Sequence, residues 1–549
     1  MSTPPQVSQL PDPPGRMPRQ IPYIIGNEGC ERFSFYGMRN ILVVFLAASF
    51  FAHLPKSVGQ AEAKEVFHTF VIGVYFFPLL GGWLSDRFFG KYNTVFWLSL
   101  VYCAGHACLA LFEDSRQGFY TGLFLIALGS GGIKPLVSAF VGDQFDQSNK
   151  HLSKKVYDAF YWIINFGSFF ASLIMPVLLR QYGAGVAFGV PGVLMLIATL
   201  VFWAGRRSYV VVPPAPPDRH SFLRVAGTAL LTPGQPAGLG TALAAVGLVL
   251  AAGSFALLAL GVLTFVEAFC LALVLLLSFG GGGTWLQLER ARGLHPDEAV
   301  EGVRAVLRIL VVFALVTPFW SLFDQKASTW VLTANDMSKP SWFSPAQMQA
   351  LNPALVMIII PFNNLVLYPW LRRRGIELSA LRRMTIGLFF AAVSWVVIGV
   401  IQLAIDGGAV MSITWQILPY ALLTFGEVLV SATGLEFAYS QAPPAMKGVI
   451  MSFWNLAVTI GNLWVLLANS SVRSEGVTSW IAGTGLSTTS FFMFFFAAFA
   501  FLAALAFWAY ARGYKEVDNY RRGEPPASPD DEPAQDLPEA RTRRYRGKS

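Results

Sequence analysis

The sequence predicts an all-α membrane protein with fourteen transmembrane helices, and three observations support this fold class. Hydrophobic residues make up 54% of the 549 residues, whereas charged residues make up only 13%, roughly half the usual share of about 25%. The mean hydropathy is +0.52. Apolar runs of about 20 residues, the length that crosses a bilayer, recur along the chain. A soluble multi-domain enzyme and a largely disordered protein are therefore both excluded.

Fourteen apolar runs are long enough to be membrane spans. They centre on residues 30–52, 64–84, 93–112, 118–140, 156–180, 185–204, 239–258, 261–280, 303–331, 351–370, 383–404, 413–437, 448–469 and 485–511. Residues 1–20 are polar and proline-rich, which predicts a disordered tail and no cleavable signal peptide. Residues 514–549 are rich in Pro, Asp, Glu and Arg and predict a disordered cytoplasmic tail.

Lys and Arg gather in one set of loops, and this asymmetry predicts the orientation of the chain. The net charge is +8, but its position in short loops indicates membrane topology and no nucleic-acid partner. Both termini are expected in the cytoplasm. The four cysteines lie in or beside apolar runs and are interpreted as small core residues, with no disulfide and no metal site: Cys30, Cys103, Cys108 and Cys270.

The middle of the chain differs from the rest. Residues 209–295 combine a proline-rich loop with two plain apolar spans that carry one acid, Glu267. The six spans in residues 21–208 and the six in residues 296–513 are richer in charged and aromatic residues. We therefore expect two six-helix bundles with two inserted helices, and two such halves around a central cavity are a common transporter plan.

Several charged residues lie inside predicted spans, where a charge costs roughly 2.5–3.5 kcal/mol on insertion scales. In the first span, Glu28, Arg32, Tyr36 and Arg39 follow helical spacing and form one polar stripe, with Glu31 beside it. The alternative is a helix end at the lipid headgroups with a local ion pair. Arg39 argues against that alternative because it lies two turns further into the helix.

Other spans carry polar or aromatic residues at helical spacing. His68 and Tyr75 share one face of the second span, where a lone histidine is either a core residue or a proton carrier. Lys134 follows a glycine-rich stretch that lacks the pattern of a phosphate loop and indicates close helix packing. The remaining candidates are Tyr161 with Asn165, Trp320 with Asp324, Asn352, Glu427 with Ser431, and Trp454.

The charges separate by half of the chain. Arg32, Arg39 and Lys134 lie in the N-terminal half, whereas Asp324 and Glu427 lie in the C-terminal half. A cavity between the halves would have a cationic and an acidic wall, which suits a small zwitterion such as a short peptide. Tyr, Trp and Asn side chains at the same level would contact its side chains and backbone.

Three motifs resemble the proton-dependent oligopeptide transporter family of the major facilitator superfamily. The family's ExxERFxYYG motif is present from Glu28 to Gly37, with Phe35 at the first Tyr position. FYxxINxG is present from Phe160 to Gly167, and the stretch from Gly434 to Pro443 is also similar. The superfamily loop motif runs from Gly82 to Lys91. The resemblance covers the chain to about Tyr514.

The resemblance implies the major facilitator fold and proton-driven import of di- and tripeptides by alternating access, without a cofactor and as a monomer. The inserted helices and the short 406–415 loop are similar to bacterial members, which implies the bacterial inner membrane. It implies a peptide-binding set of Arg32, Tyr36, Arg39, Tyr75, Lys134, Tyr161, Asn165, Trp320, Asn352, Glu427, Ser431 and Trp454. It implies a proton-coupling set of Glu28, Glu31, Arg32, His68, Lys134 and Asp324.

Three alternatives remain open from the sequence. A carrier of the same superfamily could move nitrate, a sugar or a drug-like molecule, although the acids Asp324 and Glu427 disfavour a purely anionic cargo. A membrane enzyme would need a nucleophile or base set, and the chain has neither GxSxG nor HExxH. A peptide sensor that does not transport is the third alternative.

Overall fold

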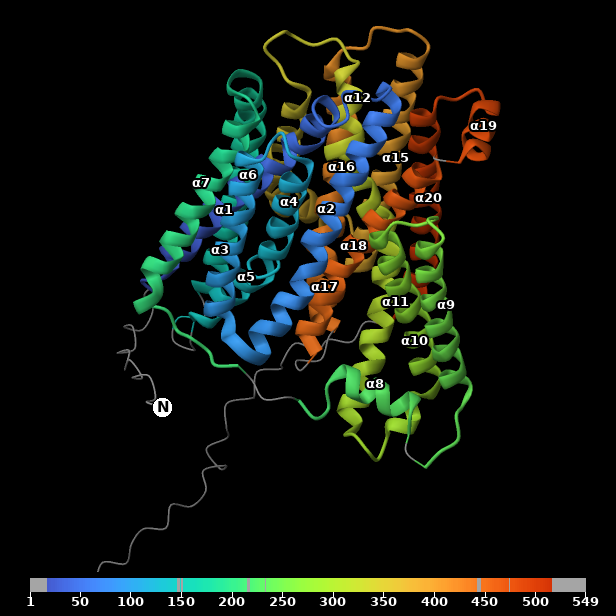
Figure 1. Cartoon of the computed structure of the whole chain (residues 1–549). Coiled ribbons are helices and arrows are strands. Elements are labelled where there is room, and N and C mark those ends of the chain that lie inside the picture. Colours follow the sequence, from blue (N-terminus) through green and yellow to red (C-terminus); the bar gives the residue numbers. More distant parts are fainter. Residues whose placement is uncertain are drawn as a thin grey trace, which may run out of the picture.

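The computed structural model describes residues 17–145, 149, 152–214, 218–232, 234–441, 446–472 and 474–515. These residues form a helical bundle, and no β-strand occurs within them (Figure 1). The predicted all-α class is confirmed. Twelve segments are long and apolar enough to cross a membrane, so the chain is an integral membrane protein. Of the predicted tails at 1–20 and 514–549, residues 1–16 and 516–549 lie outside the described residues.

The count of fourteen spans is not confirmed by these twelve segments. One of them, Lys56–Leu111, covers two helices that are separate in the structure. The first helix is not among the twelve, and it carries the charged stripe of Glu28, Glu31, Arg32 and Arg39. Charges inside a helix lower its hydropathy, so composition alone undercounts a span whose interior is functional.

Seven helices form the N-terminal half, on the left in Figure 1. They are α1 (Ile21–Ala48), α2 (Lys56–Leu84), α3 (Gly90–Leu111), α4 (Arg116–Ser130), α5 (Lys134–Asp143), α6 (Ser153–Tyr182) and α7 (Ala184–Ala204). Their buried side chains share one cluster that includes Met38, Phe67, Phe140 and Phe188.

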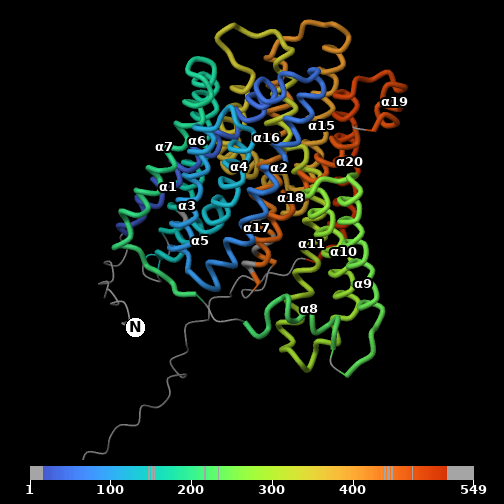
Figure 2. Tube along the Cα trace, viewed as in Figure 1, coloured from blue at the N-terminus to red at the C-terminus, as the bar shows by residue number. Residues whose placement is uncertain are grey.

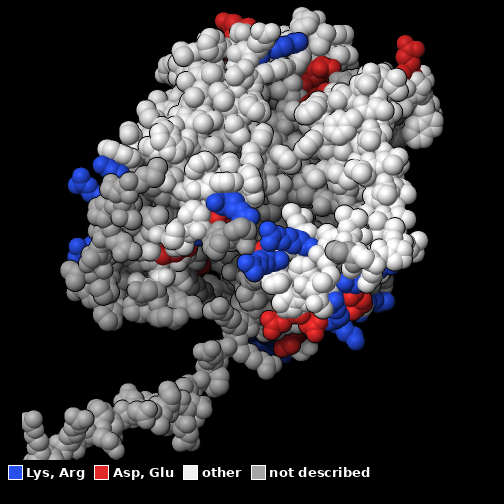
Figure 3. All heavy atoms as spheres, turned by 60° about the horizontal axis from the view of Figure 1, so that its bottom comes forward, with Lys and Arg blue, Asp and Glu red and all other residues white. Residues whose placement is uncertain are grey.

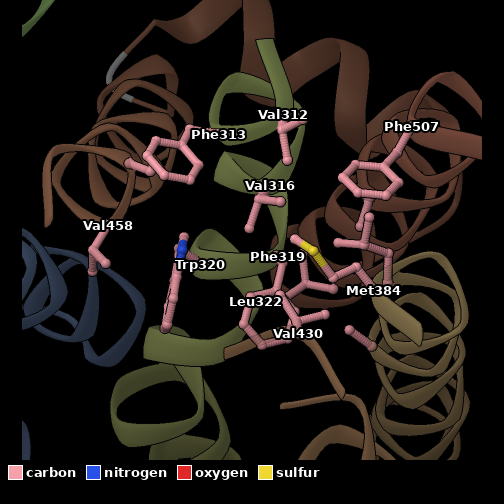
Figure 4. Packing of buried hydrophobic residues seen from close by; sticks show 14 of the residues in the cluster. Val312, Phe313, Val316, Phe319, Trp320, Leu322, Met384, Val430, Val458 and Phe507 are labelled. Atoms are coloured by element: carbon pink, nitrogen blue, oxygen red, sulfur yellow. The ribbon is translucent and has the colours of Figure 1, made fainter. Parts of the chain in front are cut away.

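The C-terminal half is built from α11 (Asp297–Gln325), α12 (Val331–Asn335), α13 (Leu351–Phe362), α14 (Tyr368–Arg373), α15 (Ala380–Asp406), α16 (Ile417–Glu427), α17 (Thr433–Gln441), α18 (Lys447–Ser471), α19 (Glu475–Gly483) and α20 (Thr488–Gly513). Helix α11 lies inside this half. Figure 4 shows Phe313 and Trp320 on the side of Val458, whereas Phe319 lies on the side of Met384 and Phe507.

Three helices lie between the halves in sequence: α8 (Phe222–Leu230), α9 (Leu239–Ala259) and α10 (Phe265–Gln287). Helices α9 and α10 form a hairpin at the flank of the C-terminal half, and α8 lies below it (Figures 1 and 2). Short segments complete the chain: η1 (Ser85–Phe89), η3 (Gly205–Arg207), η4 (Leu288–Ala291), η5 (Lys326–Trp330), η6 (Pro345–Ala350), η7 (Asn363–Leu367), η8 (Ile413–Gln416) and η9 (Val428–Ala432).

The predicted span 118–140 is interrupted, because α4 ends at Ser130 and α5 begins at Lys134. Of the two intervening glycines, Gly132 packs against the side chain of Leu98, and Gly131 packs against the backbone of α2. A Cβ on Gly131 would lie 2.6 Å from the carbonyl oxygen of Phe77, and one on Gly81 would lie 2.1 Å from that of Gly131. The glycine run therefore allows α2 and α4 to approach closely, as predicted, and it places Lys134 at the start of a new helix.

The base of the molecule carries most of the charge visible in Figure 3. Near α8, Arg292 forms ion pairs with Glu289 at 2.5 Å, with Asp297 at 2.8 Å and with Glu301, and Arg304 forms ion pairs with Glu289 and Glu301. This network joins η4 to the first turns of α11. These ion pairs are exposed, so they add little to the stability of the junction between the inserted helices and the C-terminal half.

A histidine pair at the same junction predicts a pH-dependent contact. The Nδ1 atoms of His220 and His295 are 3.0 Å apart, and His295 Nε2 lies 2.9 Å from Thr228 Oγ1 in α8. Burial and the neighbouring His220 lower the pKa of His295. Because the folded state binds the proton of His295 less readily than the unfolded state, the contact is stable above the unfolded pKa of about 6.5. It loses stability as the pH falls below that value.

We therefore expect α8 to loosen below about pH 6.5. Amide hydrogen exchange in α8, corrected for the intrinsic rate, should be faster at pH 5.5 than at pH 7.5 in the wild type. His295→Gln should remove this pH dependence. An unchanged pH dependence in the variant would show that other groups control α8.

Candidate functional site

The polar stripe of α1 forms an ion-pair cluster. Arg32 Nε donates a hydrogen bond to Glu28 Oε1 at 2.6 Å and lies 3.2 Å from Glu31 Oε2. Both carboxylates are fully buried, and Glu28 Oε2 and Glu31 Oε1 have no hydrogen-bond partner among the described residues. Two buried acids thus share one arginine, which leaves acceptor sites open for a proton or a ligand.

Arg39 joins the two halves. Its Nη2 donates to Asp324 Oδ1 of α11 at 2.6 Å, although the two residues are 285 positions apart in sequence. Both side chains are buried, with 8% and 3% of their surface exposed. Removing one partner of such a buried ion pair destabilises the folded protein by several kcal/mol, because the remaining charge is left uncompensated.

His68 lies in a chain of hydrogen bonds that continues from Asp324. Asn462 Nδ2 of α18 donates to Asp324 Oδ2 at 2.8 Å, and Asn462 Oδ1 lies 2.6 Å from His68 Nδ1. His68 Nε2 lies 2.9 Å from Ser328 Oγ in η5. Both ring nitrogens of a fully buried N-terminal-half histidine are therefore bonded to the C-terminal half.

Lys134 lies between aromatic rings. Its Nζ is 3.6 Å from the ring centroid of Phe35 and 4.7 Å from that of Tyr75. Within the described part of the chain it forms no ion pair, whereas Glu28 and Glu31 pair with Arg32. Arg32 is therefore the cation that pairs with these acids in this conformation. These cation–π contacts position the Lys134 ammonium group and leave it available to an anionic ligand.

In the C-terminal half, Asn352 and Glu427 lie together. Asn352 Nδ2 of α13 donates to Glu427 Oε2 of α16 at 2.5 Å and is 3.0 Å from Thr424 Oγ1. Lys326 Nζ donates to Asn352 Oδ1 at 3.0 Å and lies 3.1 Å from the ring centroid of Phe323. Asn352 therefore bridges a cation and an acid, so the acidic wall also contains Lys326.

Two of the π-helical segments border this site. Segment η5 begins at Lys326, directly after the α11 turn that carries Asp324, and η9 begins directly after Glu427. Such widened turns inside helices frequently mark functional sites, since they reorient side chains and loosen the backbone ladder. Ser431 lies in η9, and its buried hydroxyl has no partner among the described residues.

The aromatic candidates divide into two environments. Trp320 and Trp454 form an edge-to-face pair with centroids 5.8 Å apart, and both are at least 92% buried. Tyr161 is 42% exposed, and Asn165 donates within its own helix to the Tyr161 carbonyl at 3.0 Å. Tyr36 is half-buried and packs its ring edge-to-face on Phe35 at 5.3 Å.

The halves are joined near one end of the bundle. Between described residues, the hydrogen bonds across the halves come from the second half of α1, the first half of α2 and the second half of α6, and these ends of the three helices lie toward the top of Figure 1. Besides the His68 and Arg39 contacts, they are Gln349 to Asn40 O at 2.9 Å, Gln347 to Leu173 O at 3.0 Å, Arg180 to Ser341 O at 2.8 Å, Asn469 to Ala61 O at 2.9 Å, and Lys56 with Asp336. The halves are thus closed together at that end.

The sequence analysis missed three residues of this network. Lys326 is a charge inside a span, so the criterion that selected Asp324 could have found it. Asn462 and Ser328 carry no charge, and their role follows only from the contacts with His68. No sequence signal identifies such partners.

Buried charges that link two halves of a helical membrane bundle are characteristic of transport proteins, whose substrate and ion pathways they line. The model of the POT family matches residues 92–231 and 288–481. This chain belongs to the POT family. The assignment excludes the membrane-enzyme alternative.

Solved structures and curated relatives agree with this assignment. The structure titled "auto inhibited POT family peptide transporter" is 66% identical, with a TM-score of 0.89, covering 92% of this chain and 99% of that one. A proton-dependent oligopeptide (POT) family transporter is 63% identical, with a TM-score of 0.78, covering 89% of this chain and 100% of that one.

Two animal proteins are also similar. "Peptide transporter family 2" of Caenorhabditis elegans is 34% identical over 71% of this chain and 48% of its own length. "Solute carrier family 15 member 2" of Mus musculus is 30% identical over 80% of this chain and 56% of its own length. The chain spans about half the length of the curated relatives that it matches.

Proposed function

We propose that this protein is a proton-coupled symporter that imports di- and tripeptides by alternating access. It consists of two six-helix bundles (21–208 and 296–513) plus two inserted helices (within 209–295), fourteen transmembrane helices in all. It acts as a monomer in the bacterial inner membrane, with both termini in the cytoplasm.

One observation carries the proposal: the buried chain Arg39–Asp324–Asn462–His68–Ser328 connects the halves and contains two groups that can take up a proton, Asp324 and His68. Protonation of Asp324 would remove its attraction for Arg39. Protonation of His68 would place a donor on both ring nitrogens and a cation near Arg39. Either event weakens the closed end, which is what coupling of a proton to alternating access requires.

The peptide would lie with its carboxylate toward Arg32, Arg39 and Lys134 and its amine toward Asn165, Asn352 and Glu427. Support comes from Lys134, which is held by aromatic rings and has no ion pair among the described residues. A peptide carboxylate that reached Arg32 would compete with Glu28 and Glu31. Binding at that end would therefore favour protonation of these acids.

Substrate identity can be tested by counterflow. Vesicles loaded with unlabelled dialanine should take up labelled dialanine, and excess trialanine outside should abolish the signal while nitrate leaves it unchanged. The competing candidate is a major facilitator carrier of another small cargo, such as nitrate or a drug-like molecule. Competition by nitrate without competition by trialanine would favour that candidate.

His68 provides a test of the proton path. His68→Gln keeps hydrogen-bonding capacity toward Asn462 and Ser328 but cannot gain a proton. We expect the pH dependence of dialanine uptake between pH 5 and 8 to flatten, while counterflow without a gradient persists. The neutral control is His53→Gln, because His53 is exposed in the loop after α1. A pH profile equal to that of the wild type would assign His68 a packing role only.

A further inference from the structure

The inserted hairpin touches the C-terminal half at its two ends. At the α9–α10 turn, Cys270 packs with Leu463 and Leu466 of α18 and also with Ile72 of α2 in the N-terminal half, and Ser470 of α18 donates to Glu267. At the base, α8 and η4 pack against the first turns of α11. Between these contacts α10 stands away from α11 and α18.

The space between them is a cavity of about 830 Å³, within the usual size range of ligand pockets. Its lining is almost entirely apolar and includes Leu277 of α10, Val311 and Ala314 of α11, and Ile460 of α18. Gly281 leaves one wall open, since a Cβ there would meet only Leu307 at 3.5 Å. Val311 and Leu286 are 42% and 54% exposed, so the cavity opens to the hydrocarbon of the bilayer.

The length of the cavity matches one leaflet. On α11 its lining runs from Leu307 to Thr317, which is about 15 Å along a helix axis. The hydrocarbon core of a bilayer is about 30 Å thick. An extended acyl chain from one leaflet would therefore run along the full cavity, whereas a peptide would leave its backbone groups unsatisfied there.

The end nearest α8 carries a free cation. Arg304 is engaged by Glu289 and Glu301, but Arg308 has no carboxylate partner among the described residues. Arg308 borders the cavity, with Cζ 5.8 Å from the ring centroid of Trp285. Tryptophan is enriched at the headgroup level of a membrane, and an arginine near a helix end extends its charged group to that level. The guanidinium fork binds phosphate in a bidentate manner.

We propose that this cavity binds one acyl chain of an anionic phospholipid from the leaflet on the α8 side, with its phosphate on Arg308. The lipid fills the space that the hairpin leaves open and connects α10 to α11 and α18. The proposal does not depend on the cargo of the transporter.

Native mass spectrometry of the full chain in detergent tests it by titration with dioleoylphosphatidylglycerol, dioleoylphosphatidylcholine and oleate. The first phosphatidylglycerol should bind about tenfold more tightly than phosphatidylcholine, because the choline cation of phosphatidylcholine offsets the phosphate charge that Arg308 would bind, and more tightly than oleate. Arg308→Gln should reduce phosphatidylglycerol to the phosphatidylcholine level. Gly281→Phe should weaken the first binding step for both phospholipids, because its ring occupies the cavity.

Two controls match these variants. Gly281→Ala adds only an ordinary contact and should bind as the wild type does. Arg206 is not part of the cavity lining, and its Cζ lies 3.6 Å from the ring centroid of Trp203. Arg206→Gln should therefore keep the lipid preference. If Gly281→Phe does not fold, Ala314→Phe fills the same space from α11.

If Gly281→Phe or Ala314→Phe folds and still binds phosphatidylglycerol with the affinity of the wild type, the cavity is not the lipid-binding site. Equal wild-type affinity for the two phospholipids would overturn the role of Arg308. Tighter binding of oleate than of phosphatidylglycerol would assign the cavity to a free fatty acid and overturn the phospholipid.

Discussion

Glu427→Ala is expected to abolish measurable peptide binding. Removing one partner of a buried charge pair costs about 2–5 kcal/mol, or roughly 30-fold to several thousand-fold in affinity. The structure adds a second reason. Lys326 is held 3.0 Å from Asn352, so without Glu427 the peptide amine would meet an uncompensated cation.

Two companions make this result specific. Glu427→Gln keeps hydrogen-bonding capacity toward Asn352 but removes the charge, so it should also lose most of the affinity. Glu475→Ala changes an exposed acid in α19 and should bind dialanine as the wild type does. Isothermal titration with dialanine measures all three, and an unchanged affinity in Glu427→Ala would refute the assignment of the amine site.

Asp324→Asn is expected to eliminate proton-driven accumulation. The substitution keeps the size of the side chain but leaves Arg39 buried without its counter-charge, which costs about 3–5 kcal/mol. This penalty falls on the conformation in which the top of the bundle is closed. The closed state would lose most of its population, and a carrier that cannot close at one end equilibrates its substrate without concentrating it.

Uptake and accessibility should change together in this variant. Cysteines introduced one at a time at Gln347 and Gln349, which are buried and bond across the halves at the closed end, in a background that lacks the four native cysteines, should react faster with a membrane-impermeant maleimide in Asp324→Asn than with Asp324 present. The double variant Arg39→Asp with Asp324→Arg exchanges the two charges and keeps them opposite. It therefore tests whether accumulation requires the ion pair itself. Full accumulation in Asp324→Asn would contradict the gating role.

The positions of the membrane helices could be predicted because each span requires a long run of apolar residues. The charge criterion also found Arg39, Lys134, Asp324 and Glu427, since each breaks such a run at a high energetic cost. It could not predict that Arg39 pairs with Asp324, because a contact over 285 positions depends on how the halves pack. Asn462 was missed because a neutral amide in an apolar helix carries no comparable signal.

Local geometry also lay beyond the sequence. The glycines before Lys134 indicated close packing, but the interruption at residues 131–133 follows from the backbone of α2 lying against Gly131. Phe35, which departs from the family motif, forms the ring under Lys134. Its meaning could be recognised only once α1 and α5 were placed side by side.

The central proposal is that a proton gradient drives peptide uptake. It is tested most directly by labelled dialanine in proteoliposomes with and without an inward proton gradient. We expect accumulation above the external concentration only with the gradient, and its collapse when an uncoupler is added. Accumulation that is unaffected by the uncoupler, or a complete absence of dialanine uptake by folded protein, would contradict the account.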